Sequence, residues 1–317
     1  MHTSPAPEAA IDEWLDEYPS VKGNYGHTLL EQTDIDLDAL AGSLRPYFES
    51  AHGDARKHFH DVIGIDLHPD ATDIPTVGHA LYPSCLPPIA RHGLFGEVMC
   101  GMLAQHFDFI GKHSWTVPVF LFRHHSDVEA YLFALVRNPT RERQVFGRFG
   151  SDFLALALDN DGKVVRYLVG EAKWRAKLTP SVVNNLLFGQ WVEDDDGNRV
   201  RGNDGIWRQL NIDVPIPHGM RQLQKLLHEL DPVGMAEAIL SIDKAIMIKN
   251  NEPIERTNLV LISGNGAARR EAGEPLIAWE KAPDEYKAPH DLQVVELILS
   301  NGEDLIGRIY DSLWDGT

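Results

Sequence analysis

Three charged residues border two apolar runs in the segment GRFGSDFLALALDNDGKVVRYLVGEAKW. Asp152 precedes the first run, and Glu171 and Lys173 follow the second. The intervening DNDG (residues 159–162) is a strong turn sequence, so the two runs are predicted to form an antiparallel hairpin. Strand side chains repeat every second residue, which places Glu171 and Lys173 on one face. The spacing therefore predicts two carboxylates and an ammonium group near one end of a hairpin.

Both faces of this predicted hairpin are apolar. If DNDG forms the loop, Asp152 lies opposite Val169. The expected faces are Leu154, Leu156, Val165 and Val169 beside the charged residues, and Phe153, Ala155, Ala157, Val164 and Leu168 on the other side. Such a hairpin belongs in the interior of a sheet, where an acid needs a partner or a metal. One β-bulge would shift this register.

Two carboxylates beside a lysine suit metal-assisted hydrolysis of a phosphodiester bond. Carboxylate oxygens bind Mg²⁺, which polarises a phosphate and lowers the pKa of bound water. A lysine can orient or activate that water, or stabilise charge on phosphorus. We therefore expect Asp152 and Glu171 to be catalytic metal ligands for Mg²⁺ or Mn²⁺, and Lys173 to be catalytic. The alternative is that Asp152 caps the turn and the other two are solvated strand-end charges.

A third acid, Glu97, lies in RHGLFGEVMCGMLAQHF, whose apolar pairs predict a helix over about 93–107. Gly96 and Gly101 would let this helix approach the sheet closely. Glu97 could then join the same site. Alternatively, it is an acid of the first helical turn that complements the helix dipole.

Two other segments keep alternatives open. Asp127, in HHSDVEAY, competes with Asp152 as the metal-binding aspartate. The loop in LVLISGNGAARR follows a predicted strand, and its Arg269 and Arg270 could contact the phosphate of a small-molecule substrate. This loop lacks the third glycine of a dinucleotide motif and the lysine of a P-loop, so an ordinary strand exit is expected.

Composition restricts the class of protein. The chain has 317 residues, of which 43% are hydrophobic, enough for a substantial core. It contains no run of eighteen apolar residues and no basic, apolar leader at its N-terminus, so neither a membrane span nor a secretory signal is expected. Cys85 and Cys100 lack metal-ligand spacing and are expected to be reduced thiols in a cytoplasmic protein.

The charge is acidic overall but locally reversed. A net charge of −18 should repel nucleic acid in general. Basic residues nevertheless outnumber acids by seven to four between positions 143 and 177. The basic residues are Arg143, Arg148, Lys163, Arg166, Lys173, Arg175 and Lys177, and the acids are Asp152, Asp159, Asp161 and Glu171. This basic segment is either a docking site for a polyanion or a solvated sheet edge.

The remaining patterns predict an α/β fold with a mixed central β-sheet flanked by helices. Residues 1–36 are expected to be weakly ordered or wrapped on the surface. The expected elements are helices at 36–50 (interrupted by Pro46), 180–191, 218–232, 234–248 and 303–314, and strands at 61–67, 117–122, 130–136, 257–263 and 292–299.

Glu97 on a helix, Asp152 opening a strand and Glu171-Ala172-Lys173 closing the next resemble the PD-(D/E)xK nuclease superfamily, whose core is αβββαβ. The resemblance spans roughly residues 90–192. GRFGSDFLAL followed by LVGEAKW, with GE on the earlier helix, also resembles the HamA nuclease subunit of Hachiman anti-phage defence systems. Ser151, rather than proline, precedes Asp152.

The resemblance implies a restriction-endonuclease-like core, with a partly helical N-terminal region at 1–88 and a nuclease-like domain at 89–317. It implies an Mg²⁺-dependent deoxyribonuclease in antiviral defence that works with a helicase partner on DNA. By position, Asp152 and Glu171 would bind metal, Lys173 would be the catalytic lysine and Glu97 an accessory acid. The alternative is a non-catalytic subunit that binds nucleic acid or a partner protein and has a nuclease-like fold.

Overall fold

The computed structural model describes residues 1–63, 81–137, 153–212, 216–217, 219–248, 253–267, 270–277 and 280–314. Its helices are α1 (Glu8–Trp14), α2 (Leu37–Ile63), α3 (Pro88–His106), the 3₁₀-helix η3 (Leu121–His124), α4 (Ser126–Arg137), α5 (Pro180–Phe188), α6 (Ile206–Leu210), α7 (Met220–Leu230), α8 (Ala236–Met247) and α9 (Gly302–Ser312). Its strands are β1 (Leu15–Lys22), β2 (Tyr25–Gln32), β3 (Trp115–Thr116), β4 (Phe153–Leu158), β5 (Val164–Leu178), β6 (Trp191–Glu193), β7 (Arg199–Arg201), β8 (Glu255–Gly266) and β9 (Asp291–Leu299).

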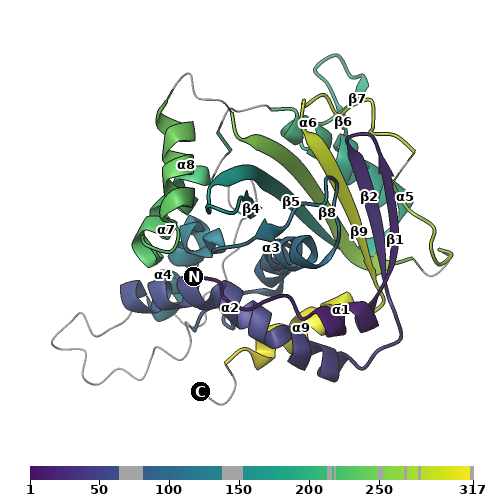
Figure 1. Ribbon diagram of the computed structural model, residues 1–317. Coiled ribbons are helices and arrows are strands. Elements are labelled where there is room, and N and C mark those ends of the chain that lie inside the picture. The colour runs from purple at the N-terminus through teal and green to yellow at the C-terminus, as the bar shows by residue number, and fades with distance from the viewer. Residues whose placement is uncertain are drawn as a thin grey trace.

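Seven strands form one mixed sheet in the order β1-β2-β9-β8-β5-β4-β3 (Figure 1). The four central strands, β2, β9, β8 and β5, run parallel. The strands beyond them pair antiparallel, β1 on β2 at one edge and β4 and β3 beyond β5 at the other. Along the chain, α3 is followed by β3, and η3 and α4 lie between β3 and the antiparallel hairpin of β4 and β5. After α5 come β6, β7, α6, α7 and α8, and then β8, which is parallel to β5. The predicted α/β fold with a mixed sheet is confirmed.

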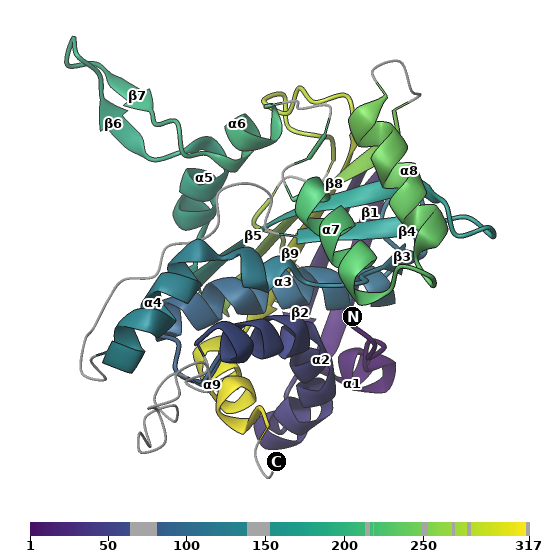
Figure 2. The same ribbon diagram turned by 90° about the vertical axis from the view of Figure 1, so that its left-hand side faces the viewer.

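Helices cover both faces of the sheet (Figure 2). One face, called here the α3 face, packs against α2, α3 and α9 in the largest apolar cluster. The opposite α5 face carries two clusters. One lies under α5 and α6, against β2, β8 and β9, and the other lies under α7 and α8, against β4 and β5. Within the described ranges, no helix combines the length and apolarity needed to cross a bilayer.

Local sequence explains several elements. The Thr179 hydroxyl accepts a hydrogen bond from the Val182 amide at 3.3 Å, so Thr179 caps α5 as predicted, with Pro180 in the first turn. In the DNDG turn, Asp159 Oδ1 accepts hydrogen bonds from the amides of Asp161 and Lys163, each at 2.9 Å. The amphipathic helices α7 and α8, the strands β8 and β9 and the terminal helix α9 are confirmed.

The prediction for residues 1–36 is wrong. They form α1, β1 and the almost fully buried strand β2, which pairs with β9. The sequence of β2 contains the polar residues His27, Thr28 and Glu31, which made a buried strand hard to predict. In the fold each of them is buried and has a partner. His27 Nε2, for example, lies 2.8 Å from Glu296 Oε1 on β9. The predicted segments 1–88 and 89–317 thus contribute to one sheet and one core.

Three further predictions are wrong: the strands at 117–122 and 130–136, and the interruption of the helix at Pro46. Residues 117–122 are mostly irregular and lead into η3, and residues 130–136 belong to α4. The buried residues of α4 recur at helical spacing, at Val128, Tyr131, Leu132 and Leu135. Helix α2 continues through Pro46 to Ile63, because its apolar face stays packed against the core. The predicted strand at 61–67 therefore begins as helix, and its last four residues lie outside the described residues. Cys85 and Cys100 are free thiols, as predicted.

Candidate functional site

Glu171 and Lys173 form an ion pair on β5. Lys173 Nζ donates a hydrogen bond to Glu171 Oε1. The Glu171 side chain is 12% exposed and that of Lys173 is 30% exposed. Their neighbours in the ladder are Val260 and Ile262 of β8, both fully buried. A carboxylate and an ammonium group therefore lie side by side on an interior strand and remain partly open to solvent.

This pair lies on the α5 face, between the two apolar clusters of that face. Tyr167 and Val169 precede it on β5 and belong to the cluster under α7 and α8. Val260 and Ile262 belong to the cluster under α5 and α6. The charged pair therefore occupies the boundary between the two covering layers, where an ion pair is partly shielded from water and its attraction strengthened.

The hairpin forms, but in a different register from the one predicted. Val169 pairs with Leu154, not with the position of Asp152, because the ladder is irregular between Ala157 and Leu158. Asp152 itself lies outside the described residues. The bulge also exchanges the roles of Val164 and Val165, since Val164 is buried and Val165 is exposed.

The predicted faces of the hairpin are otherwise confirmed. The members on the α5 face are Leu154, Leu156 and Val169, and those on the α3 face are Phe153, Ala155, Ala157 and Leu168. Both sets are buried, so β4 and β5 form an interior hairpin as expected.

Helix α3 approaches β5 closely at Gly96, as predicted. A Cβ atom at Gly96 would lie 3.0 Å from the Cβ of Ala172, the residue between Glu171 and Lys173. Gly101 serves a different contact: its position faces the rings of Phe120 and Tyr47. The turn of α3 that carries Glu97 therefore packs directly behind the strand segment with the charged pair.

Glu97 is buried in the middle of α3. The helix begins at Pro88, not near residue 93, so Glu97 is not in the first turn and the helix-dipole alternative is wrong. Glu97 Oε1 lies 3.5 Å from Nε2 of His125, which is also buried. The two side chains form a carboxylate–histidine pair in the layer that covers the α3 face.

Further polar groups surround this pair. Nδ1 of His52 on α2 lies 2.8 Å from the Tyr82 hydroxyl, and Nε2 lies 3.1 Å from the Tyr310 hydroxyl of α9. Burial, with a smaller contribution from the nearby His125, lowers the pKa of His52 to about 3. His52 is therefore neutral in the folded protein, and it joins α2 to α9.

The sequence pattern HHSD pointed to Asp127, but its neighbour His125 is the residue that reaches a predicted site residue. Asp127 lies in the first turn of α4. His125 lies between η3 and α4, where its side chain turns inward to Glu97. Local spacing offered no signal for this contact, because it joins two segments that are distant in sequence.

The described residues alone hold no group of three or more His, Cys, Asp or Glu side chains that could bind a metal ion. Of the predicted ligands, Glu171 and Glu97 are described and Asp152 is not. Carboxylate oxygens suit Mg²⁺ or Mn²⁺. Because Asp152 is not described, the predicted set of metal ligands stays a prediction.

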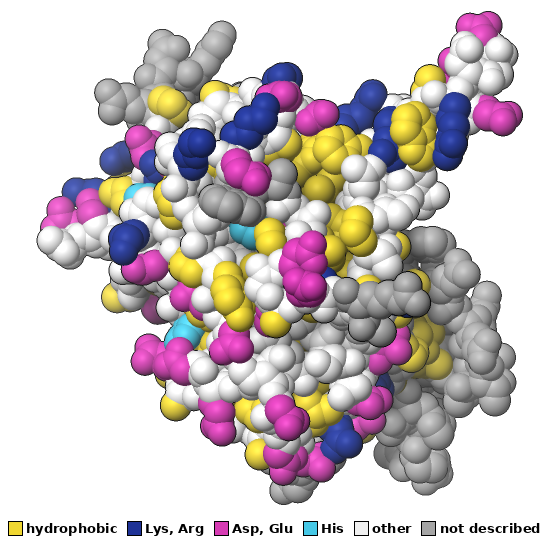
Figure 3. Space-filling model, turned by 90° about the vertical axis from the view of Figure 1, so that its right-hand side faces the viewer, with side chains coloured by type: hydrophobic (Ala, Val, Ile, Leu, Met, Phe, Trp, Pro, Cys, Tyr) yellow, Lys and Arg dark blue, Asp and Glu magenta, His cyan; other side chains and the backbone are white. Residues whose placement is uncertain are grey.

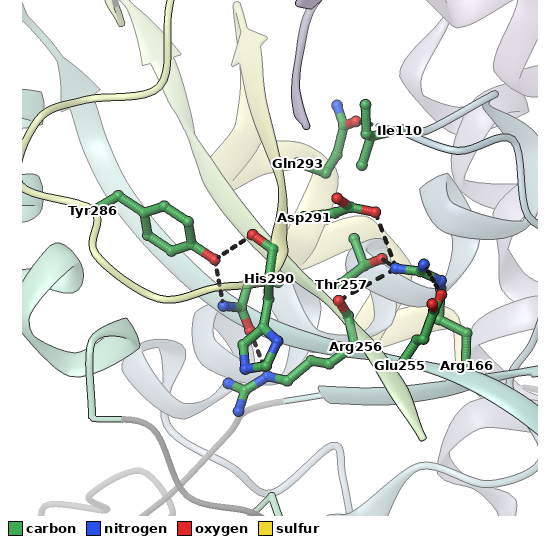
Figure 4. A network of polar contacts seen from close by, with 10 residues as sticks. Ile110, Arg166, Glu255, Arg256, Thr257, Tyr286, His290, Asp291 and Gln293 are labelled. Carbon is green, nitrogen blue, oxygen red and sulfur yellow. Dashed lines mark hydrogen bonds and ion pairs between the residues drawn. The ribbon is translucent and has the colours of Figure 1, made fainter. Parts of the chain in front are cut away.

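Part of the basic segment is neutralised by its own surroundings, whereas Arg143 and Arg148 lie outside the described residues. Arg166 binds Glu255 and lies 3.0 Å from Asp291, and it also donates to the Thr257 hydroxyl at 3.1 Å (Figure 4). Lys163 pairs with Asp161. Arg166 therefore joins the beginnings of β8 and β9 to β5, which is a structural role.

A second polar chain continues from this point in Figure 4. Arg256 Nε donates to the Asn258 amide oxygen at 2.7 Å, and the Asn258 amide donates to the Tyr286 hydroxyl at 2.8 Å. The Tyr286 hydroxyl donates to the His290 carbonyl at 3.0 Å. These bonds fasten the loop before β9 to the sheet.

The glycine loop after β8 offers little to a phosphate. Arg270 is paired with Glu31 of β2 and donates to the Glu274 carbonyl, and Arg269 lies outside the described residues. The Arg270 guanidinium thus serves to hold the loop against the sheet, which weakens the small-molecule alternative.

No protein-family model matches this sequence, and no curated protein shows significant similarity to it.

Proposed function

We propose that this chain is a metal-dependent nuclease that hydrolyses phosphodiester bonds in DNA. The observation that carries the proposal is the Glu171–Lys173 pair, half-covered on the interior strand β5. Replacing a desolvated ion pair by well-packed apolar residues is often neutral or stabilising, because desolvation of the charges is costly, so stability alone does not account for this pair. Partial exposure leaves the pair within reach of a substrate.

The order of elements supports the same proposal. If η3 and α4 before β4, and the five elements β6 to α8 before β8, are regarded as insertions, then α3, β3, β4, β5, α5 and β8 follow the αβββαβ order expected of a restriction-endonuclease-like core. The resemblance to PD-(D/E)xK nucleases rests on this order and on the positions of Glu171 and Lys173.

The proposed roles rest on residue type and on the contact between Lys173 and Glu171. Glu171 and Asp152 would hold Mg²⁺ or Mn²⁺. Glu97 pairs with His125 in the layer over the α3 face, across β5 from Glu171, so it is not included among these ligands. The bound ion would polarise the phosphate and lower the pKa of an attacking water. Lys173 touches Glu171, so its ammonium group stays beside anything bound to that carboxylate. There it can orient the water or stabilise charge on phosphorus.

We further propose that the chain is the nuclease subunit of a Hachiman-type defence complex, acting in the cytoplasm with a helicase. The net charge of −18 fits this arrangement, because it weakens the binding of the free nuclease to DNA at physiological salt, so that a partner is needed to deliver it efficiently.

Cleavage of supercoiled plasmid and linear duplex tests the proposal. The purified chain is incubated with Mg²⁺, Mn²⁺ or EDTA, with and without a helicase encoded beside it. Glu171→Gln and Lys173→Met should each reduce metal-dependent cleavage by about 10²-fold or more. Lys163→Met, at the other end of the hairpin, is the matched control and should cut like wild type.

Two aspartate variants separate the competing ligand assignments. Asp152→Asn should abolish cleavage, whereas Asp127→Asn in α4 should not. Equal activity of Glu171→Gln and wild type would show that the site is elsewhere. Silence of the wild type even with its partner would favour the non-catalytic binding subunit.

A further inference from the structure

The segment between α5 and α6 leaves the body of the protein as a two-stranded arm, defined here as residues 190–204 (Figure 2). β6 and β7 pair only with each other. Trp191 and Val192 are 48% and 46% exposed. An isolated hairpin of this length is marginally stable, so its exposed side chains call for an explanation.

Two arginines of the arm stack on the ring of Trp191. The guanidinium carbon of Arg199 lies 5.1 Å above the Trp191 ring centroid and that of Arg201 lies 4.2 Å above it. Arg201 also donates to the Asn185 amide oxygen at 2.9 Å and to the Gly189 carbonyl at 2.7 Å. Arg201 therefore anchors the arm to the end of α5, while Arg199 is stacked and exposed.

Exposed cations also line the chain between the candidate site and the arm. Arg175 and Lys177 follow Lys173 on the last part of β5, and Arg208 lies on α6; all three are exposed. Within the described part of the chain, no carboxylate lies within ion-pair distance of Lys177, Arg199 or Arg208. The basic residues of this region thus differ from Arg166 and Lys163, whose charges are paired.

The charges of the molecule are unevenly distributed (Figure 3). Most Lys and Arg side chains of this view lie in its upper half, from the upper left to the arm and interspersed with Asp and Glu, while Asp and Glu dominate the lower half. The upper half contains the layer of α5 and α6, on the same face of the sheet as Glu171 and Lys173. An anion with an extended charge would therefore meet the molecule on this side.

We propose that the arm and the end of β5 form one surface that binds the phosphate backbone of duplex DNA and guides it to the Glu171–Lys173 pair. Helix α5, which separates the two cationic groups, is roughly 14 Å long at 1.5 Å per residue. One turn of duplex, about 34 Å, spans that separation. The arm also carries acids: Glu193 lies opposite Arg199 in the β6–β7 ladder, and Asp194–Asp196 form its tip.

This inference deepens the proposed function, and binding measured in EDTA keeps its test independent of cleavage. The anisotropy of a labelled duplex of about 30 bp is followed between about 50 and 200 mM KCl. Lys177→Glu and Arg199→Glu should each weaken binding and reduce the slope of log affinity against log salt by about 1. The double variant should lose about 2, because the two sites are independent.

The matched control is Lys57→Glu, a charge reversal at an exposed lysine of α2, on the opposite side of the sheet. It should weaken duplex binding less than the other two variants. Circular dichroism checks that every variant is folded. The proposed surface would be overturned if the Lys177→Glu and Arg199→Glu variants bound duplex with the same affinity as Lys57→Glu. It would also be overturned if the wild type did not bind duplex at low salt. Loss of helicase association with DNA binding intact would likewise overturn it and assign the arm to a protein partner.

The two proposals can fail separately. If wild type binds through the arm but does not cut with metal, the nuclease proposal fails and the surface stands. If wild type cuts and the arm variants bind normally, the surface fails and the nuclease stands.

Discussion

Several buried or partly buried acids in this protein are each held by a specific base. Glu171 is held by Lys173, Glu97 by His125 and Glu296 by His27. The first pair could be anticipated, because strand alternation places residues i and i+2 on one side. The others join segments that are distant in sequence, so no local pattern reveals them.

At the residue scale, His52 predicts acid sensitivity. Burial lowers its pKa from 6.5 to about 3, so between these values the unfolded chain binds a proton that the folded chain excludes. The free energy of unfolding contributed by His52 should therefore fall as pH drops below 6.5, by about 2 kcal/mol between about pH 8 and pH 5.

Urea unfolding at both pH values measures this loss. His52→Gln should be less stable than wild type at about pH 8, where it replaces well-formed hydrogen bonds, but should lose about 2 kcal/mol less on acidification. His228→Gln, an exposed position on α7, should keep the wild-type profile. An unchanged pH dependence in His52→Gln would contradict the assignment.

At the element scale, the contact of α3 with β5 sets the position of the candidate site. Gly96 touches Ala172 without room for a larger side chain, whereas Gly93 of the same helix has no atom within 4 Å of its would-be Cβ. At Gly96 the helix therefore approaches the strand closely, directly behind Glu171 and Lys173.

Gly96→Val should lower the free energy of unfolding by about 2 kcal/mol, because it pushes α3 off the sheet. Gly93→Val, at an exposed position of the same helix, should change it by only a few tenths of a kcal/mol. Urea denaturation compares the two. Similar values for both variants would show that the close approach is not important for stability.

At the scale of the whole molecule, the sheet is assembled from both ends of the chain. β2 lies beside β9, and Ile11, Trp14 and Leu30 are fully buried in the cluster that also contains α9 residues. The N-terminal segment is therefore part of the core that supports β8 and β5.

Removal of residues 1–32 should abolish cooperative folding, because it exposes one side of β9 and removes buried aromatic and aliphatic side chains. Near-ultraviolet circular dichroism and thermal melting would report the loss. Replacement of Trp191–Arg201 by a short Gly-Ser turn should leave the melting temperature almost unchanged. A stable, cooperatively melting fragment without residues 1–32 would show that the core forms without β2.

Several features followed from the sequence alone because they depend on neighbouring residues. The DNDG turn, the apolar faces of β4 and β5, the Thr179 cap and the amphipathic helices α7 and α8 are local patterns of hydrogen bonding or periodicity. The proximity of Glu171 and Lys173 belongs to this class.

Only the tertiary structure decided the rest. The bulge after Ala157 set the hairpin register, and the partner strand β9 made the polar-looking β2 a buried strand. Packing against the core turned residues 126–137 into a helix and brought His125 to Glu97. Each of these outcomes depends on contacts between segments far apart in sequence, whose energies no local pattern contains.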